Sequence, residues 1–218
     1  EKSMNTHLHI MEAYTTLYEA SKDNKVQQQL RALTVLMCEK VVNKDLHFGL
    51  FYTRDWTCCS HDVSFGHDIE GTWLLDLAAN QITDTKLAAT IRSLTTSMAK
   101  VTAQYGVDYD GATFNEFRDG HLIDSDRVWW VQAESMIGYF NAYQKTGQSK
   151  FLDLSKGCFN IIKTQLLDNI NGEWYWKVNR YGEPYKDCPK VEPWKCPYHN
   201  GRACLEMYKR IVQIENDK

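Results

Sequence analysis

Paired amphipathic helix patterns fill most of this chain and limit what it can fold into. Apolar residues recur at offsets 0, 3, 4, 7 and 8 from Ile10, which predicts a helix over about residues 3–20. A second stripe runs from Val26 to Val41, and the short polar turn Ser21–Asn24 between the two stripes suits antiparallel helices. The same spacing predicts five further helices, near 66–79, 84–104, 126–145, 148–169 and 197–214.

The stretches between the helix pairs have the pattern of β-hairpins. Alternating residues over Phe48–Thr53 and Trp174–Val178 predict strands, the latter followed by the turn residues Asn179–Gly182, and Gly111–Ile123 is a weaker third case. The order helix, turn, helix, hairpin therefore repeats about three times and ends in a seventh helix. This order predicts an all-α fold, an α/α toroid in which alternate helices form an inner ring and the long connections surround a central cleft.

Four histidine- or tryptophan-bearing clusters recur where inner helices are expected to begin. The intervals are 58 residues from His9 to His67, 63 from His67 to Trp130, and 69 from Trp130 to His199. Such a spacing indicates one repeating unit that points equivalent positions toward one place. A helix N-terminus also offers unpaired N–H groups and a positive dipole end, which suit sugar hydroxyls or an oxyanion.

Composition narrows the class of protein. The 218 residues are 43% hydrophobic and 24% charged with a net charge of −3, which is typical of a globular protein and unfavourable for nucleic acid. This composition allows one or two domains, and because no linker divides the chain we expect a single domain over 1–218. No apolar run is long enough for a membrane span and the start has no secretory pattern, so we expect a cytoplasmic protein. The seven cysteines lack paired C-x-x-C spacing and are expected to be reduced, without a function.

Two histidines are the candidate acid–base groups. His67 and Glu70 are three residues apart on one helix face, so the carboxylate could orient the imidazole, although this pair alone is more typical of a helix cap and a solvated turn. His199 follows Pro197 at a helix start, where the dipole disfavours the cation and would keep a neutral base. A surface cap is the alternative for His199.

The remaining candidates suit sugar binding. Trp130 and Glu134 are four residues apart, as are Asn5 and His9, and Trp73 and Trp194 could supply stacking faces. A tryptophan is nevertheless more often a core anchor than a ligand platform.

Three chemistries could use such residues. A metal site of His61, His67 and Glu70 lacks a recognisable ligand run, so no metal or other cofactor is predicted. A glycosidase could use Glu70 and Glu134 but would leave the histidines unexplained. Proton abstraction beside a sugar carbonyl needs bases tuned near neutral pH, which the two histidines supply, and we favour it.

At three long segments the chain resembles the N-acylglucosamine 2-epimerase superfamily, and within it the cellobiose 2-epimerases. The segments are Phe65–Trp73, Arg127–Glu134 and Glu192–Arg202. The resemblance implies an (α/α)6 barrel, of which this chain would be an incomplete C-terminal part with about seven helices and short hairpins. It also implies epimerisation at C2 of the reducing-end glucose of β-1,4-linked disaccharides, converting cellobiose to glucosyl-mannose and lactose to epilactose through a cis-enediol.

The resemblance also implies a role for each site residue. His67 and His199 would be the acid–base pair, Glu70 would position His67, and the sugar would be bound by Asn5, His9, Trp73, Trp130, Glu134 and Trp194. The expected partners are the disaccharide and the N-terminal portion of the barrel or another chain that completes the fold. The alternatives are a monosaccharide or N-acylglucosamine 2-epimerase, an aldose–ketose isomerase, and a non-catalytic sugar-binding fragment.

Overall fold

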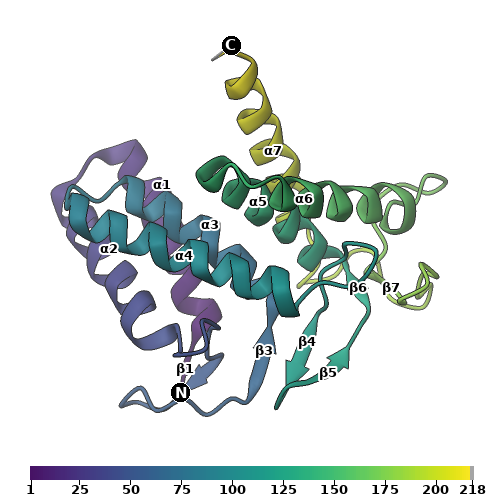
Figure 1. Ribbon diagram of the computed structural model, residues 1–218, viewed down its shortest axis with the longest axis horizontal. Helices are drawn as coiled ribbons and strands as arrows, with labels where there is room; N and C mark the ends of the chain where they lie inside the picture. Colours follow the sequence, from purple (N-terminus) through teal and green to yellow (C-terminus); the bar gives the residue numbers. More distant parts are fainter. Residues whose placement is uncertain (217–218) are drawn as a thin grey trace. The chain divides into compact units, whose positions relative to one another are not determined.

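A computed structural model describes residues 1–216 (Figure 1). Among these residues lie seven helices: α1 (Met4–Ser21), α2 (Asn24–Leu36), α3 (Phe65–Asn80), α4 (Thr85–Tyr105), α5 (Trp129–Thr146), α6 (Ser149–Ile161) and α7 (His199–Asn216). The short strands are β1 (Lys2–Ser3), β2 (Phe51–Tyr52), β3 (Asp62–Ser64), β4 (Glu116–Arg118), β5 (His121–Asp124), β6 (Arg127–Val128) and β7 (Lys177–Val178). The mainly helical prediction is confirmed, and so is each of the seven helices.

The chain divides into two compact units. The first consists of Glu1–Gln104 and Glu116–Ile123, and the second of Tyr105–Asn115 and the chain from Asp124 onward. The first unit holds α1 to α4, and the second holds α5 to α7. That 1–218 forms a single domain stays a prediction.

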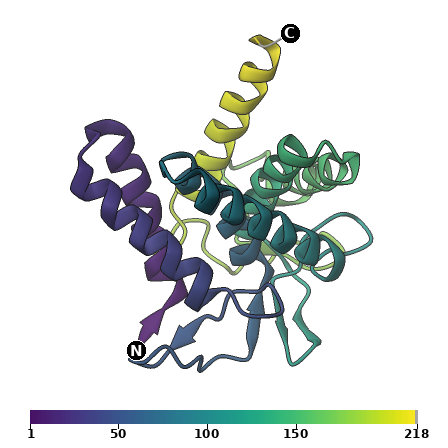
Figure 2. The same ribbon diagram turned by 60° about the vertical axis from the view of Figure 1, so that its left-hand side comes forward.

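Local capping explains the first helix pair. Ser3 caps α1 by accepting a hydrogen bond from the Thr6 N–H, and the C-cap after Ser21 is Lys22, which adopts a left-handed conformation with φ 54°. Asp23 then caps α2 by accepting from the N–H groups of Lys25 and Val26. The predicted polar turn is therefore a C-cap followed directly by an N-cap, and Figure 2 shows the two helices as a hairpin.

Helix α3 forms the buried centre of the first unit. It contacts α1 and α2, and Thr95 of α4 donates a hydrogen bond to Asp76 of α3 at 2.7 Å. Gly71 allows the closest approach, because a Cβ added there would lie 2.1 Å from the Phe48 ring. Most of α3 is buried, whereas α2 and α4 keep one exposed face.

Small antiparallel pairings connect the helices of the first unit. β1 pairs with β2 in the register Lys2 with Tyr52, and β3, β4 and β5 form a three-stranded sheet. The hairpin predicted around residues 48–53 is reduced to β2 and isolated bridges, of which one joins Val42 to Phe48 and another joins Tyr52 to Cys58. β3 runs directly into α3 and so fixes where that helix begins.

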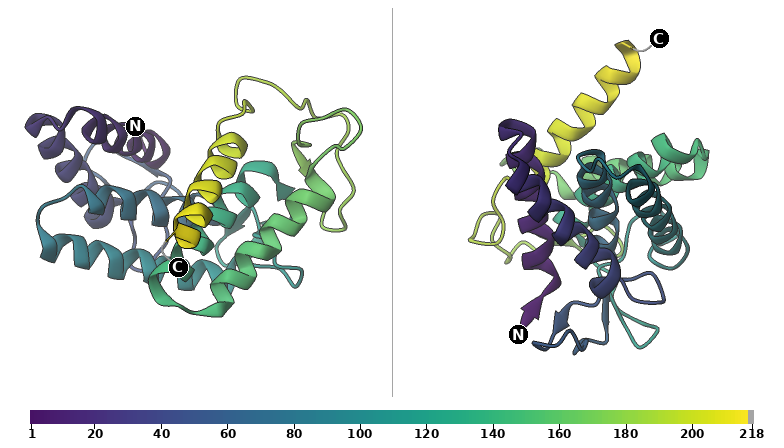
Figure 3. Two further views of the ribbon diagram at one scale, coloured as in Figure 1. Left: turned by 90° about the horizontal axis from the view of Figure 1, so that it is seen from above. Right: turned by 90° about the vertical axis from the view of Figure 1, so that its left-hand side faces the viewer.

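In the second unit, α5 packs against both α6 and α7. The α5–α6 turn is made by Gly147, whose φ of 67° allows its N–H to bond the Tyr143 carbonyl. The paired green helices of Figure 3 show this hairpin. Gly111 and Gly157 bring a loop against α6, since a Cβ on Gly157 would lie 3.2 Å from the Gly111 Cα.

Three helix boundaries differ from a regular α-helix over the predicted ranges. α5 begins at Trp129 instead of near residue 126, because Arg127 and Val128 pair with Val178 and Lys177 as β6 and β7. The second and sixth helices each end in one π-helical turn, over Met37–Val41 and Ile162–Leu166. Of the helices described over residues 1–216, none is long and apolar enough to cross a membrane.

Candidate functional site

His199 is the first residue of α7 and is held by a carboxylate of α5. Its Nδ1 lies 2.8 Å from Oε1 of Glu134, and Nη2 of Arg202, one turn further along α7, donates to the same oxygen at 2.7 Å. The Glu134 side chain is fully buried. Burial alone would raise the pKa of Glu134, but the Arg202 guanidinium and the His199 ring outweigh it and lower this pKa.

Three aromatic rings surround the His199 imidazole. Trp129 and Tyr198 stand edge-on to it, with ring centroids 5.5 and 4.8 Å away, and Trp130 is tilted at 5.6 Å. The Arg202 guanidinium in turn lies 4.4 Å from the centroid of the Tyr198 ring. These contacts hold the plane of the imidazole, and the Glu134 carboxylate engages its Nδ1.

His67 occupies the corresponding place in the first unit, near the start of α3. Its Nδ1 lies 2.8 Å from the hydroxyl of Ser64, the last residue of β3. Sequence reasoning chose Glu70 as the partner that orients His67 and missed Ser64. Glu70 is fully buried on the same helix, and its positioning role stays a prediction.

Asp68 anchors the start of α3, and the sequence interpretation gave it no role. One of its oxygens accepts a hydrogen bond from the Phe48 N–H at 2.8 Å, and the other lies 2.7 Å from Nδ1 of His47. The His47 ring stands edge-on to Phe65. Burial alone would lower the pKa of His47, but the Asp68 carboxylate outweighs it and raises this pKa.

The other predicted sugar-binding residues differ in exposure. Trp73 is almost completely buried on α3, at 1% exposed, whereas Trp194 is 81% exposed on the connection before α7. The neighbour of Trp194, Lys195, is the buried side chain of that segment. Stacking of a sugar on either tryptophan stays a prediction.

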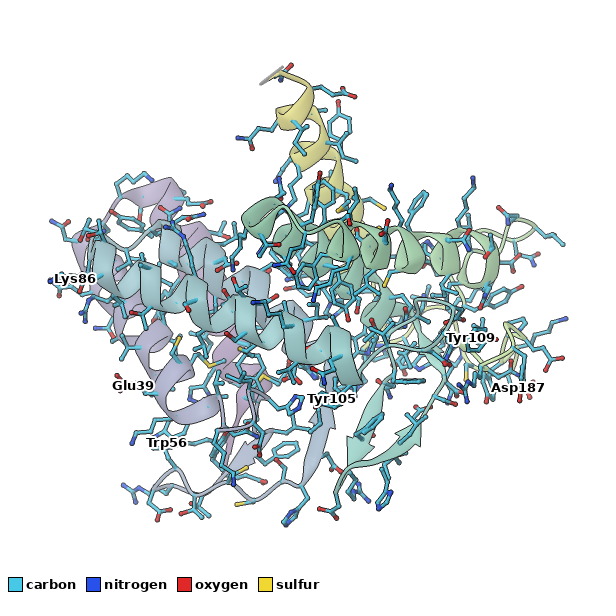
Figure 4. The ribbon with its side chains drawn as sticks, in the orientation of Figure 1. Glu39, Trp56, Lys86, Tyr105, Tyr109 and Asp187 are labelled. Carbon is cyan, nitrogen blue, oxygen red and sulfur yellow. The ribbon has the colours of Figure 1, made fainter. Side chains whose placement is uncertain are left out.

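Asn5 and His9 lie on α1, one turn apart. Asn5 is exposed, and His9 Nδ1 lies 3.1 Å from a Glu12 oxygen. His7, also on α1, contacts the Ser3 carbonyl and stands edge-on to Trp56, which is labelled in Figure 4.

The structure brings together three of the predicted residues within the second unit, namely Trp130, Glu134 and His199. Of the other six, it places Asn5, His9, His67, Glu70 and Trp73 in the first unit and leaves Trp194 exposed in the second. Arg202, which the sequence showed only as part of a polar helix start, belongs to the Glu134 cluster.

Comparison with known proteins identifies the family. The model of the N-acylglucosamine 2-epimerase family matches residues 1–201. This chain belongs to that family. A cellobiose 2-epimerase of Bacteroides fragilis is 43% identical over 209 residues, which cover 94% of the chain and 53% of the relative. A cellobiose 2-epimerase of Dictyoglomus turgidum is 40% identical over 97% of the chain and 54% of its own length.

A solved epimerase structure has the same fold. The cellobiose 2-epimerase of Bacillus thermoamylovorans matches with a TM-score of 0.90 and 39% identity, over 96% of this chain and 54% of that one. The chain therefore has the fold of the family and spans about half the length of the relatives that it matches.

Proposed function

We propose that this chain carries the acid–base groups of a sugar 2-epimerase. The observation that carries the proposal is the His199–Glu134–Arg202 cluster. In it the buried Glu134 carboxylate contacts one ring nitrogen of His199, and aromatic rings pack around the imidazole. A carboxylate on Nδ1 fixes the tautomer and stabilises the imidazolium that forms when Nε2 takes a proton. Arg202 keeps the carboxylate ionised throughout.

The reaction follows from that arrangement. In an open-chain aldose, the C2 proton is acidic because the carbanion is delocalised into the C1 carbonyl. Nε2 of one histidine takes this proton, the C2–H electrons form the C1=C2 bond, and the C1 oxygen takes up a proton to give a cis-enediol. Return of a proton to the opposite face of C2, with loss of the C1 hydroxyl proton, gives the epimer without any net redox change.

Epimerisation needs proton donors on both faces of C2, and the chain offers two histidines at helix starts. We assign the two roles to His67 and His199, with Ser64 and Glu134 as the groups that hold their Nδ1 atoms. Glu70 would support His67. A hydrogen bond at Nδ1 leaves Nε2 as the atom that exchanges the proton in each case.

The substrate class rests on the relatives and on the aromatic side chains. The two curated relatives named above are cellobiose 2-epimerases, so we propose the reducing-end glucose of β-1,4-linked disaccharides, with cellobiose and lactose as substrates. Trp130 beside His199 offers a stacking face. Trp73, Trp194, Asn5 and His9 remain proposed sugar contacts.

Activity is assigned to the completed protein, meaning this chain together with the remaining portion of the barrel, on the same or another polypeptide. The test is incubation of cellobiose in heavy water with the completed protein and with this chain alone, followed by proton NMR at C2. Deuterium at C2 with formation of glucosyl-mannose supports the proposal. No exchange by a folded, completed protein would leave a sugar-binding role, which cellobiose titration would detect.

Product analysis separates the alternative enzymes. A monosaccharide or N-acylglucosamine 2-epimerase would act on mannose or N-acetylglucosamine and leave cellobiose unchanged. An aldose–ketose isomerase would deliver the proton to C1 and accumulate a ketose, which carries no C2 proton.

A further inference from the structure

One carboxylate oxygen in the second unit joins three separate parts of the chain. Oε1 of Glu173 accepts hydrogen bonds from Nζ of Lys195 at 3.1 Å, from Nδ2 of Asn200 at 2.9 Å, and from the N–H of Trp174 at 2.9 Å. Glu173 itself sits in the turn before β7 with φ 62°, a left-handed conformation that non-glycine residues rarely adopt. Such a residue is held by its surroundings, and here the surroundings are the connection to α7 and the helix start.

Asn200 is the residue after His199. It is 8% exposed in the first turn of α7, so its bond to Glu173 fixes the position of that turn. Because His199 precedes it directly, a shift of Asn200 moves the imidazole with respect to Glu134.

Lys195 supplies a second link to the same histidine. Its side chain is 1% exposed, and its ammonium donates to Glu173 and to the Lys190 carbonyl and lies 4.8 Å from the centroid of the Trp129 ring. Trp129 is the ring that stands edge-on to His199. A buried ammonium needs a carboxylate partner, and Glu173 is that partner.

The connection that precedes α7 has little regular structure of its own. Lys190, which is partly exposed, pairs with Asp168 and donates to the Gly172 carbonyl, so the contacts of both lysines end on the turn that contains Glu173. Burial alone would raise the pKa of Glu173, but the Trp174 N–H, Lys195 and Asn200 outweigh it and lower this pKa. The turn therefore acts as an ionic anchor for the segment that ends at His199.

We propose that Glu173 is a positioning residue for His199. It acts through Asn200 and through Lys195 and Trp129, and it does not touch the substrate. The expected fall in kcat rests on the proposed function, whereas the expected displacement of the His199 imidazole does not. Loss of Glu173 should misplace the imidazole without unfolding the unit.

The test uses Glu173→Ala and Glu173→Gln, with Glu183→Ala as the matched control. Glu183 is an exposed carboxylate of the neighbouring turn, where it accepts a hydrogen bond from Nδ2 of Asn179 at 2.7 Å. Histidine side-chain NMR on 15N-labelled completed protein reports the His199 ring, assigned with His199→Gln. Steady-state epimerisation of cellobiose reports kcat and KM separately.

Glu173→Ala should shift or broaden the His199 Nδ1 signal and lower kcat on the order of tenfold to a hundredfold, with KM changed by less than about threefold. Glu173→Gln keeps an oxygen acceptor for Asn200 and the Trp174 N–H, and should recover part of kcat. Glu183→Ala should match the wild type in both readouts.

An unchanged His199 signal in folded Glu173→Ala overturns the proposal, whatever the activity. So does a kcat that falls only in proportion to the folded fraction. If the second variant, Lys195→Met, leaves the His199 signal unchanged while Glu173→Ala moves it, the route through Trp129 is overturned. If the wild type does not epimerise cellobiose at all, the proposed function fails. The His199 NMR signal in the Glu173 variants still decides whether Glu173 positions His199.

Discussion

Oε1 of Glu134 lies 2.8 Å from Nδ1 of His199 and so connects the interior of α5 with the first residue of α7. The same oxygen accepts from Arg202, one turn further along α7. A histidine at a helix start is often only a cap, but a buried, ionised partner on another helix is the arrangement of an orienting carboxylate and its base.

Glu134→Gln tests that relationship. The amide keeps the shape but removes the charge, so Arg202 loses this buried carboxylate and His199 loses the anion that stabilises its imidazolium. We expect a loss of about 3 kcal/mol in the free energy of unfolding and a fall in kcat of about a hundredfold or more. Urea unfolding and epimerisation rates measure the two effects, and a stable variant with wild-type kcat would contradict the role of Glu134.

Gly71→Ala tests the packing of α3 against the segment before β2. The new methyl group would overlap the buried Phe48 ring, so we expect a cost of about 1–3 kcal/mol in thermal or urea unfolding. Gly201→Ala is the matched control on α7, because a Cβ there meets nothing within 4 Å, and a gain of about 0.5–1 kcal/mol is expected from helix propensity. Equal effects at both sites would contradict the close approach of α3 and Phe48.

Acid stability depends in part on Asp108. Arg180 pairs with both of its oxygens and the buried Arg127 with one, and the Arg180 guanidinium also lies 5.8 Å from the ring centroid of Tyr109, which is labelled in Figure 4. Burial alone would raise the pKa of Asp108, but Arg180, Arg127 and the Tyr109 N–H lower it to about 2.

A depressed pKa contributes stability above the ordinary value of 3.8 and loses it as the pH falls toward about 2. Urea unfolding between pH 5 and pH 2, on the order of the pKa range of carboxylates, should therefore show a steep loss that Asp108→Asn flattens. An unaltered slope in the variant would show that Asp108 titrates normally.

Asp68→Asn tests the anchor at the start of α3. The amide cannot accept from both the Phe48 N–H and a protonated His47, so we expect a loss of about 1–3 kcal/mol on urea unfolding. Asp62→Asn is the control, since Asp62 pairs with the exposed Arg118 on β3 and β4 and should cost less than about 1 kcal/mol. Similar losses in both variants would contradict the structural role of Asp68.

Local patterns predicted the helices well but not the partners of the site residues. The 3.6-residue period and the polar turn at Ser21–Asn24 determine the first hairpin, and the caps at Ser3 and Asp23 bear this out. The helices differ from the predicted ones only at their ends. One difference is the π turns, and the other is the late start of α5, because residues of β6 pair through their backbones with β7 and this pairing overrides side-chain periodicity.

Partners far apart in sequence leave no local signal. Arg202 and Glu134 are 68 residues apart, and Asp68 and His47 are 21 apart, so neither pair shows in a periodicity. Trp194 was chosen for its type, yet the adjacent Lys195 is the side chain that is buried, because Glu173 neutralises it. Burial of a lysine is decided by such a partner and cannot be predicted from composition.

The most direct test of the account is C2 deuterium exchange on cellobiose in heavy water by the completed protein and by its His199→Ala variant, with folding of both confirmed. The account predicts deuterium at C2 and glucosyl-mannose with the wild type, and near-complete loss of exchange in the variant. Retained exchange in His199→Ala, or no exchange by the folded wild type, would contradict it.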